Sequence, residues 1–157
     1  MTDSANLTLS LLDRLRDEDP KVTLESEQHR TVSERQVLDS VIRDIENLLN
    51  TRSSPIDIPT AFQYLKSSLA GYGIKDFSVE NPDTSQVRQK LCKEIETAIH
   101  RFEPRLQKPV VRLEREGKEK GQLFFRITGV LVVEPIKEPV SFDTFFDVGR
   151  GRYMIAK

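Results

Sequence analysis

Apolar residues in the first two thirds of the chain recur at helical spacing. Between positions 37 and 49 they form one stripe: Val37, Leu38, Val41, Ile42, Ile45, Leu48 and Leu49. Ser33 and Gln36 precede this stripe with the spacing of a capping box, in which each residue satisfies a backbone N–H of the other. The pattern predicts a helix over about residues 33–50, followed by the turn residues 50–55.

A second stripe predicts another long helix, ending at about Phe102. Its members are Val87, Leu91, Ile95, Ala98, Ile99 and Phe102, with Cys92 beside them. Shorter apolar groups predict two small helices. One lies near the N-terminus, where Leu7, Leu11, Leu12 and Leu15 share a helical face, and the other lies at about residues 60–70, before Gly71 and Gly73.

From Leu106 onward the period changes from 3.6 to 2, which is the period of a strand. Val111 and Leu113 alternate with charged residues, the polar segment 116–121 predicts a turn, and residues 123–133 alternate again. These two segments are expected to form a hairpin. Val140, Phe142 and Phe145 indicate a further strand or an edge segment, and residues 152–156 a short final strand.

Helices followed by strands predict an α+β fold, with N-terminal helices packed on a small C-terminal antiparallel sheet. We expect residues 1–32 to comprise the amphipathic N-terminal helix and a polar linker, 17–32, that lets this helix dock at a distance. Residues 33–157 are expected to form one domain. A chain of 157 residues is long enough to bury a core without metal or disulfide support.

Composition removes several classes of function. Charged residues make up 31% of the chain and the net charge is −1, so no overall field attracts nucleic acid or anionic lipid. The N-terminus lacks a basic secretory signal, and no apolar run approaches the ~20 residues of a membrane helix. Cys92 is the single cysteine, which excludes an intrachain disulfide. These features predict a cytoplasmic protein that binds neither nucleic acid nor the membrane interior.

Candidate catalytic groups give a weak signal. Glu103 is one of 25 acidic residues, so a second carboxylate near it, such as Glu94, Glu96 or Asp143, is expected by chance alone. His29 and His100 are isolated, and no zinc, phosphate-loop or dinucleotide motif is present. We therefore predict no catalytic, cofactor-binding or metal-binding residue.

The segment RFEPRL, residues 101–106, has a definite structural role. A residue before proline avoids the α region, so Glu103 should end the preceding helix, and Pro104 should start an extended stretch. Glu103 and Arg105 then project to the same side. They can pair with each other or each hold a partner group. Local physics favours a solvated pair, which contributes only about 0–1 kcal/mol.

Several motifs resemble those of the TssE family of type VI secretion baseplate subunits. They occur in the expected order: LLDRL at 11–15, VIRDIENLLNTR at 41–52, GYGIKDFS at 71–78, IHRFEPRL at 99–106, LFFRITGVL at 123–131 and VSFDTFFDVGRGRY at 140–153. The family is similar to the small wedge protein of contractile phage tail baseplates, which has carried the label "lysozyme-related". The resemblance covers nearly the whole chain.

The resemblance implies a structural role in a Gram-negative secretion apparatus. The expected partners are the wedge subunits TssF, TssG and TssK and the sheath subunits TssB and TssC, with the spike or hub as a further candidate. A sheath strand would add to an edge of the C-terminal sheet, so that sheath polymerisation starts in register. The family's Glu-Pro-Arg motif falls on Glu103, Pro104 and Arg105.

Arg52 and Asp143, which lie in two of the quoted motifs, are expected as additional partner-binding residues. The alternative function is a peptidoglycan hydrolase acting at the cell wall, in which Glu103 would be the acid.

Overall fold

The computed structural model describes residues 7, 10–15, 32–56, 58–59, 61–76, 84–114, 122–147 and 149–156. Two long helices dominate its first part, α2 (Glu34–Asn50) and α4 (Ser85–Phe102). The predicted capping box at the start of α2 is confirmed. The Ser33 hydroxyl accepts the Gln36 N–H at 3.2 Å, and the Gln36 side chain accepts the Ser33 N–H at 2.8 Å.

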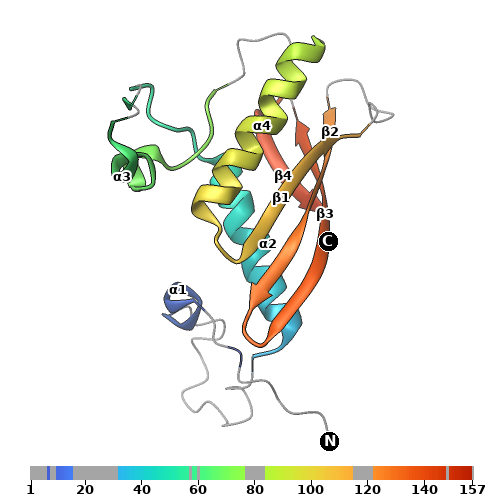
Figure 1. Cartoon of the computed structure of the whole chain (residues 1–157). Helices are drawn as coiled ribbons and strands as arrows, with labels where there is room; N and C mark the ends of the chain where they lie inside the picture. The colour runs from blue at the N-terminus through green and yellow to red at the C-terminus, as the bar shows by residue number, and fades with distance from the viewer. Residues whose placement is uncertain are drawn as a thin grey trace, which may run out of the picture.

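Three shorter helices accompany them. They are α1 (Leu11–Leu15), α3 (Gln63–Lys66) and the 3-10 helix η2 (Leu69–Gly71). The predicted helix at about residues 60–70 is thus divided into two short pieces. The described residues between 52 and 76 (52–56, 58–59 and 61–76) form an excursion away from the long helices and the sheet. A parallel bridge joins Arg52 to Ile74 at the base of this excursion, and α3 stands away from the sheet (Figure 1).

Four antiparallel strands form a single sheet. They are β1 (Leu106–Leu113), β2 (Gln122–Val133), β3 (Ile136–Asp147) and β4 (Arg152–Ala156), in the order β1-β2-β3-β4. The predicted hairpin and final strand are confirmed. The segment with Val140, Phe142 and Phe145 is an internal strand and not an edge segment, because β4 pairs with its outer side. The predicted turn at 116–121 lies outside the described residues.

The long helices cover one face of the sheet, with α4 packed on β1 and α2 on β4 (Figure 1). The interface is apolar. Its most completely buried apolar side chains are Val41, Ile45, Leu48, Leu49, Ile95, Ile99, Leu106, Phe125, Ile127 and Leu131. Both helical stripes therefore face the inward side chains of the strands, and the predicted α+β fold is confirmed.

The N-terminal helix differs from the expectation. Leu7 lies before α1 and is buried, whereas Leu11, Leu12 and Leu15 are exposed on it. The helix contacts α2 through Asp13, on its polar side. The predicted linker, 17–32, lies outside the described residues except for Val32.

Candidate partner-binding site

Glu103, Pro104 and Arg105 form the junction between α4 and β1. As predicted, α4 ends before Glu103, whose φ of −123° and ψ of 79° lie outside the helical region. The Glu103 N–H still donates to Ile99 O at 2.8 Å, and the Glu103 carbonyl accepts the Leu106 N–H at 3.1 Å. Pro104 is exposed. The junction therefore turns the chain from helix to strand within three residues.

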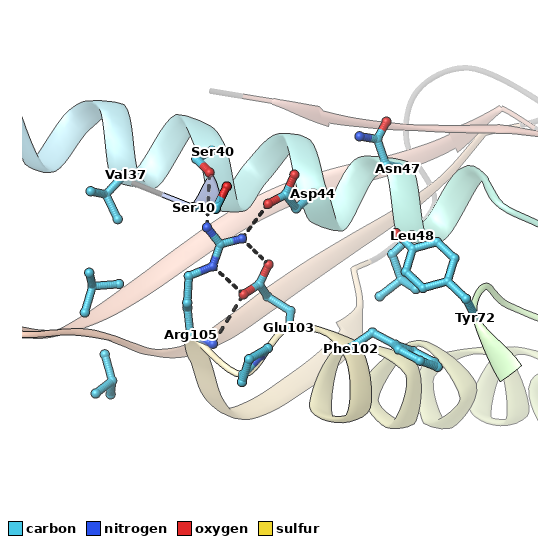
Figure 2. A pocket seen from close by; sticks show the side chains of 13 residues that line it. Ser10, Val37, Ser40, Asp44, Asn47, Leu48, Tyr72, Phe102, Glu103 and Arg105 are labelled. Carbon is cyan, nitrogen blue, oxygen red and sulfur yellow. Dashed lines mark hydrogen bonds and ion pairs between the residues drawn. The ribbon is translucent and has the colours of Figure 1, made fainter. Parts of the chain in front are cut away.

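Glu103 and Arg105 bind each other through two parallel contacts (Figure 2). Arg105 Nε donates to Glu103 Oε1 at 2.7 Å, and Arg105 Nη2 donates to Glu103 Oε2 at 2.6 Å. The Arg105 backbone N–H adds a third bond to Oε1 at 3.2 Å. This fork geometry is the strong form of an arginine–carboxylate pair.

Helix α2 holds the other side of the guanidinium. Arg105 Nη2 donates to Asp44 Oδ2 at 2.5 Å, and Nη1 donates to the Ser40 hydroxyl at 3.1 Å. Ser40 and Asp44 lie four residues apart and so share a face of the helix. Arg105 therefore ties the start of β1 to the middle of α2.

The pair is not the solvated one that local physics favoured. Glu103 is only 3% exposed, because Arg105 and α2 lie over it. Hydrogen bonding to Glu103 raises the pKa of Arg105, partial burial opposes this, and the charge of Glu103 with the contacts to Asp44 adds to the increase. The guanidinium is thus fixed as a cation between two carboxylates.

A pocket of about 470 Å³ opens beside this pair (Figure 2). Its walls come from α2, the α4–β1 junction, the end of β2 and Tyr72. Phe102 and Tyr72 contact each other edge to face, with ring centroids 5.1 Å apart. Burial raises the pKa of Tyr72, and the charges of Asp44 and Glu103 act in the same direction. The pocket therefore combines an aromatic wall with a charged one.

The other two predicted residues lie elsewhere. Arg52 pairs with Asp76 at 3.0 Å at the base of the 52–76 excursion. Asp143 lies on the exposed face of the sheet and accepts from Arg126 Nε at 2.9 Å. Neither residue lines the pocket. The structure thus brings together three of the five predicted partner-binding residues.

The carboxylates are poorly placed for acid catalysis. Both oxygens of Glu103 are bound to Arg105, whereas a general acid needs a proton that can reach a substrate. Glu96 accepts the Val111 N–H, and Asp143 binds Arg126. Within the described ranges, no cluster of three or more His, Cys, Asp or Glu side chains is arranged to hold a metal ion.

One edge of the sheet is already occupied by polar groups. On β1, the outward N–H of Val111 donates to Glu96 Oε1 of α4 at 2.8 Å. The Leu106 N–H donates to the Glu103 carbonyl, and Pro109 has no N–H. None of these three positions of β1 therefore offers a backbone N–H to another strand.

Among the described residues, the opposite edge is occupied at one position. Asn50, at the end of α2, donates from Nδ2 to Tyr153 O and accepts the Tyr153 N–H, both at 2.9 Å. These groups must point away from β3. Because orientation repeats every two residues, Ile155 directs its N–H and carbonyl the same way. In the described part of the chain, no strand lies beyond β4.

A family model described as baseplate wedge protein gp25 matches residues 35–136, well over half of the chain. The chain belongs to the gp25 family of baseplate wedge proteins. The matched region includes α2, α4 and the Glu103–Arg105 pair, so the gp25 family assignment rests on the part of the fold that builds the pocket. A gp25-family protein is a structural component of a baseplate. No curated protein matches the chain.

No helix in the described part of this gp25-family chain is long and apolar enough to cross a membrane.

The sequence analysis did not identify three side chains that bind Arg105 or the edge of β4: Ser40, Asp44 and Asn50. Ser40 and Asp44 lie outside the predicted apolar stripe of their helix, and Asn50 was placed among the turn residues 50–55. Their spacing gave no local signal, because their partners lie 61 or more residues away in the sequence.

Proposed function

We propose that this gp25-family protein is the TssE-type baseplate subunit of a type VI secretion system. In this proposal it joins the wedge subunits TssF, TssG and TssK on the cytoplasmic side of the inner membrane. It then helps the first ring of TssB and TssC sheath subunits to assemble. The motif order in the sequence and the match to the gp25 family support this assignment.

The proposal that a sheath strand adds to the sheet is supported by the difference between the two sheet edges. A strand added to β1 would have to displace Glu96 and would meet Pro109, whereas Ile155 on β4 offers both backbone groups. Strand addition uses such unpaired groups for affinity. We therefore assign β4 as the edge that receives a sheath strand.

The wedge part of the proposal rests on the surface around the pocket. Pro104 is exposed and Arg105 keeps 24% of its side chain accessible, while Glu103 serves to hold Arg105 in place. Arg52 and Asp143, with 69% and 62% of their side chains exposed, are additional contacts. The protein acts by binding and not as an enzyme, since Glu103 is committed to Arg105.

Substitution of Ile155 tests the sheath part. Proline removes the outward N–H, which an edge strand tolerates within its own sheet, whereas alanine removes the same side chain and keeps the N–H. We expect cells with Ile155→Pro to form at least tenfold fewer fluorescent sheaths than cells with Ile155→Ala, at matched protein levels. Equal sheath counts for the two variants would exclude β4 as the receiving edge.

A further inference from the structure

One carboxylate holds the N-terminal arm, residues 7 and 10–15, against α2. Asp13 Oδ2 accepts hydrogen bonds from the hydroxyls of Ser40 and Ser10, each at 2.6 Å. Its other oxygen, Oδ1, pairs with Arg43 Nη2. Only 6% of the Asp13 side chain is exposed. The site thus surrounds both oxygens of a carboxylate with donors.

The rest of the arm is weakly attached. Helix α1 has five residues, far fewer than a helix needs to be stable alone. Its three leucines, Leu11, Leu12 and Leu15, are 71–74% exposed. Among the described residues of the arm, burial is confined to Leu7 and Asp13. A segment with so few buried contacts opens at low free-energy cost.

The arm also lies where a partner would approach Arg105. Ser10 lines the pocket, and the Ser40 hydroxyl that donates to Asp13 accepts from Arg105 Nη1 (Figure 2). One serine therefore connects the arm to the Glu103–Arg105 pair. A partner surface placed over Arg105 must lie against the arm or replace it.

The donors around Asp13 favour a negatively charged group. Burial acts to raise the pKa of Asp13, but hydrogen bonds from Ser10, Ser40 and Arg43, with the charge of Arg43, together lower this pKa to about 2. If Asp13 leaves, the partners of Arg43 among the described residues are the Ser40 hydroxyl, which accepts from Nη2 at 3.5 Å, and Asp44, at 3.6 Å. Asp44 is the one carboxylate of the two, and it is shared with Arg105. Another carboxylate would restore the missing ion pair, and a cationic side chain would not.

We propose that Ser40 and Arg43 form a carboxylate-binding site that Asp13 fills in the isolated chain and that an acidic side chain of a baseplate partner fills in the assembly. The arm is then a built-in occupant that the partner displaces. The exchange rests on the proposed function, because it requires a partner at the surface around Arg105. The carboxylate site itself does not.

Acetate tests the site on the isolated protein. The Asp13→Ala variant opens the site, and a tethered carboxylate competes at an effective concentration in the millimolar range. Sodium acetate, followed by NMR shifts of the Ser40 and Arg43 amides, should half-saturate this variant at a concentration at least tenfold lower than the wild type. Sodium chloride at equal ionic strength controls for screening. Failure of acetate to saturate the variant, or equal half-saturation in both proteins, would overturn the proposal.

A distance measurement tests whether Asp13 holds the arm in place. Spin labels at Leu12 and Lys93, two exposed positions, report the distance from the arm to α4 in a Cys92→Ala background. Asp13→Asn keeps the side-chain shape and should broaden this distance distribution, while the melting temperature stays within a few degrees. An unchanged distribution would show that Asp13 does not hold the arm. Neither measurement uses sheath formation, so each can fail while the proposed function stands.

Discussion

Arg105 is the residue on which the junction depends. It binds Glu103, Asp44 and Ser40, so one side chain joins the end of α4, the start of β1 and the middle of α2. The same atoms that make it a candidate partner contact also hold the fold together. A loss of assembly after its truncation must therefore be separated from a loss of stability.

Arg105→Ala should destabilise the fold strongly. Removal of the guanidinium leaves Glu103 buried and charged without its partner, which costs roughly 3–5 kcal/mol. Arg52→Ala is the matched control, because its pair with Asp76 is exposed and worth only about 0–1 kcal/mol. Urea unfolding measures both free energies. Similar losses for the two variants would contradict a structural role for the Glu103–Arg105 pair.

At the scale of elements, α2 acts on the sheet through its last residue. The Asn50 amide bonds both backbone groups of Tyr153, as a residue of a neighbouring strand would do. Burial, with a smaller contribution from Cys92, raises the pKa of Tyr153, whose ring packs against Phe146 with centroids 4.5 Å apart. The end of α2 therefore fixes β4 by hydrogen bonds, and Phe146 of β3 adds packing.

Asn50→Ala should loosen β4. The variant loses the two neutral hydrogen bonds to Tyr153, each worth about 0.5–1.5 kcal/mol, so we expect a loss of roughly 1–3 kcal/mol in the free energy of unfolding. It also loses the exposed bond from Nδ2 to the Glu46 carbonyl of the same helix. Asn47→Ala gives the same gain in helix propensity at an exposed position on the same helix. Amide exchange at Tyr153 should accelerate in the first variant alone. If both variants exchange at the wild-type rate, Asn50 does not cap the strand.

The elements were predictable from the sequence to the extent that their signals are local. The Ser33–Gln36 capping box and the apolar stripes lie within one helix, and the alternation after Leu106 lies within one strand. The role of α1 was not predictable, because its leucines share a helical face and yet stay exposed. The contacts of Arg105 with Ser40 and Asp44 span 65 and 61 residues, so they depend on how α2 packs.

On the scale of the whole molecule, the two proposed contact surfaces lie on different elements. The pocket surface is built where α4 meets β1, against the middle of α2, whereas the open edge belongs to β4. The sheet joins them, because β1 and β4 are its two outer strands. A subunit built in this way can hold the wedge with one side and present a strand edge at another. The two activities should therefore be separable by mutation.

Pro104→Glu and Ile155→Pro should separate them. Pro104 is exposed, so a carboxylate there changes the wedge surface and leaves Arg105 bound to Glu103. Ile155→Pro changes the edge of β4 and the partly buried Ile155 side chain, and it leaves the residues that line the pocket unchanged. We expect the tagged Pro104→Glu protein to lose its foci with TssK. The tagged Ile155→Pro protein should keep these foci and form no sheath from them. Pro104→Ala controls for loss of the proline ring, and melting of each purified variant controls for folding. If both variants lose TssK foci together, the pocket and the β4 edge serve one contact, and the division of roles between them is wrong.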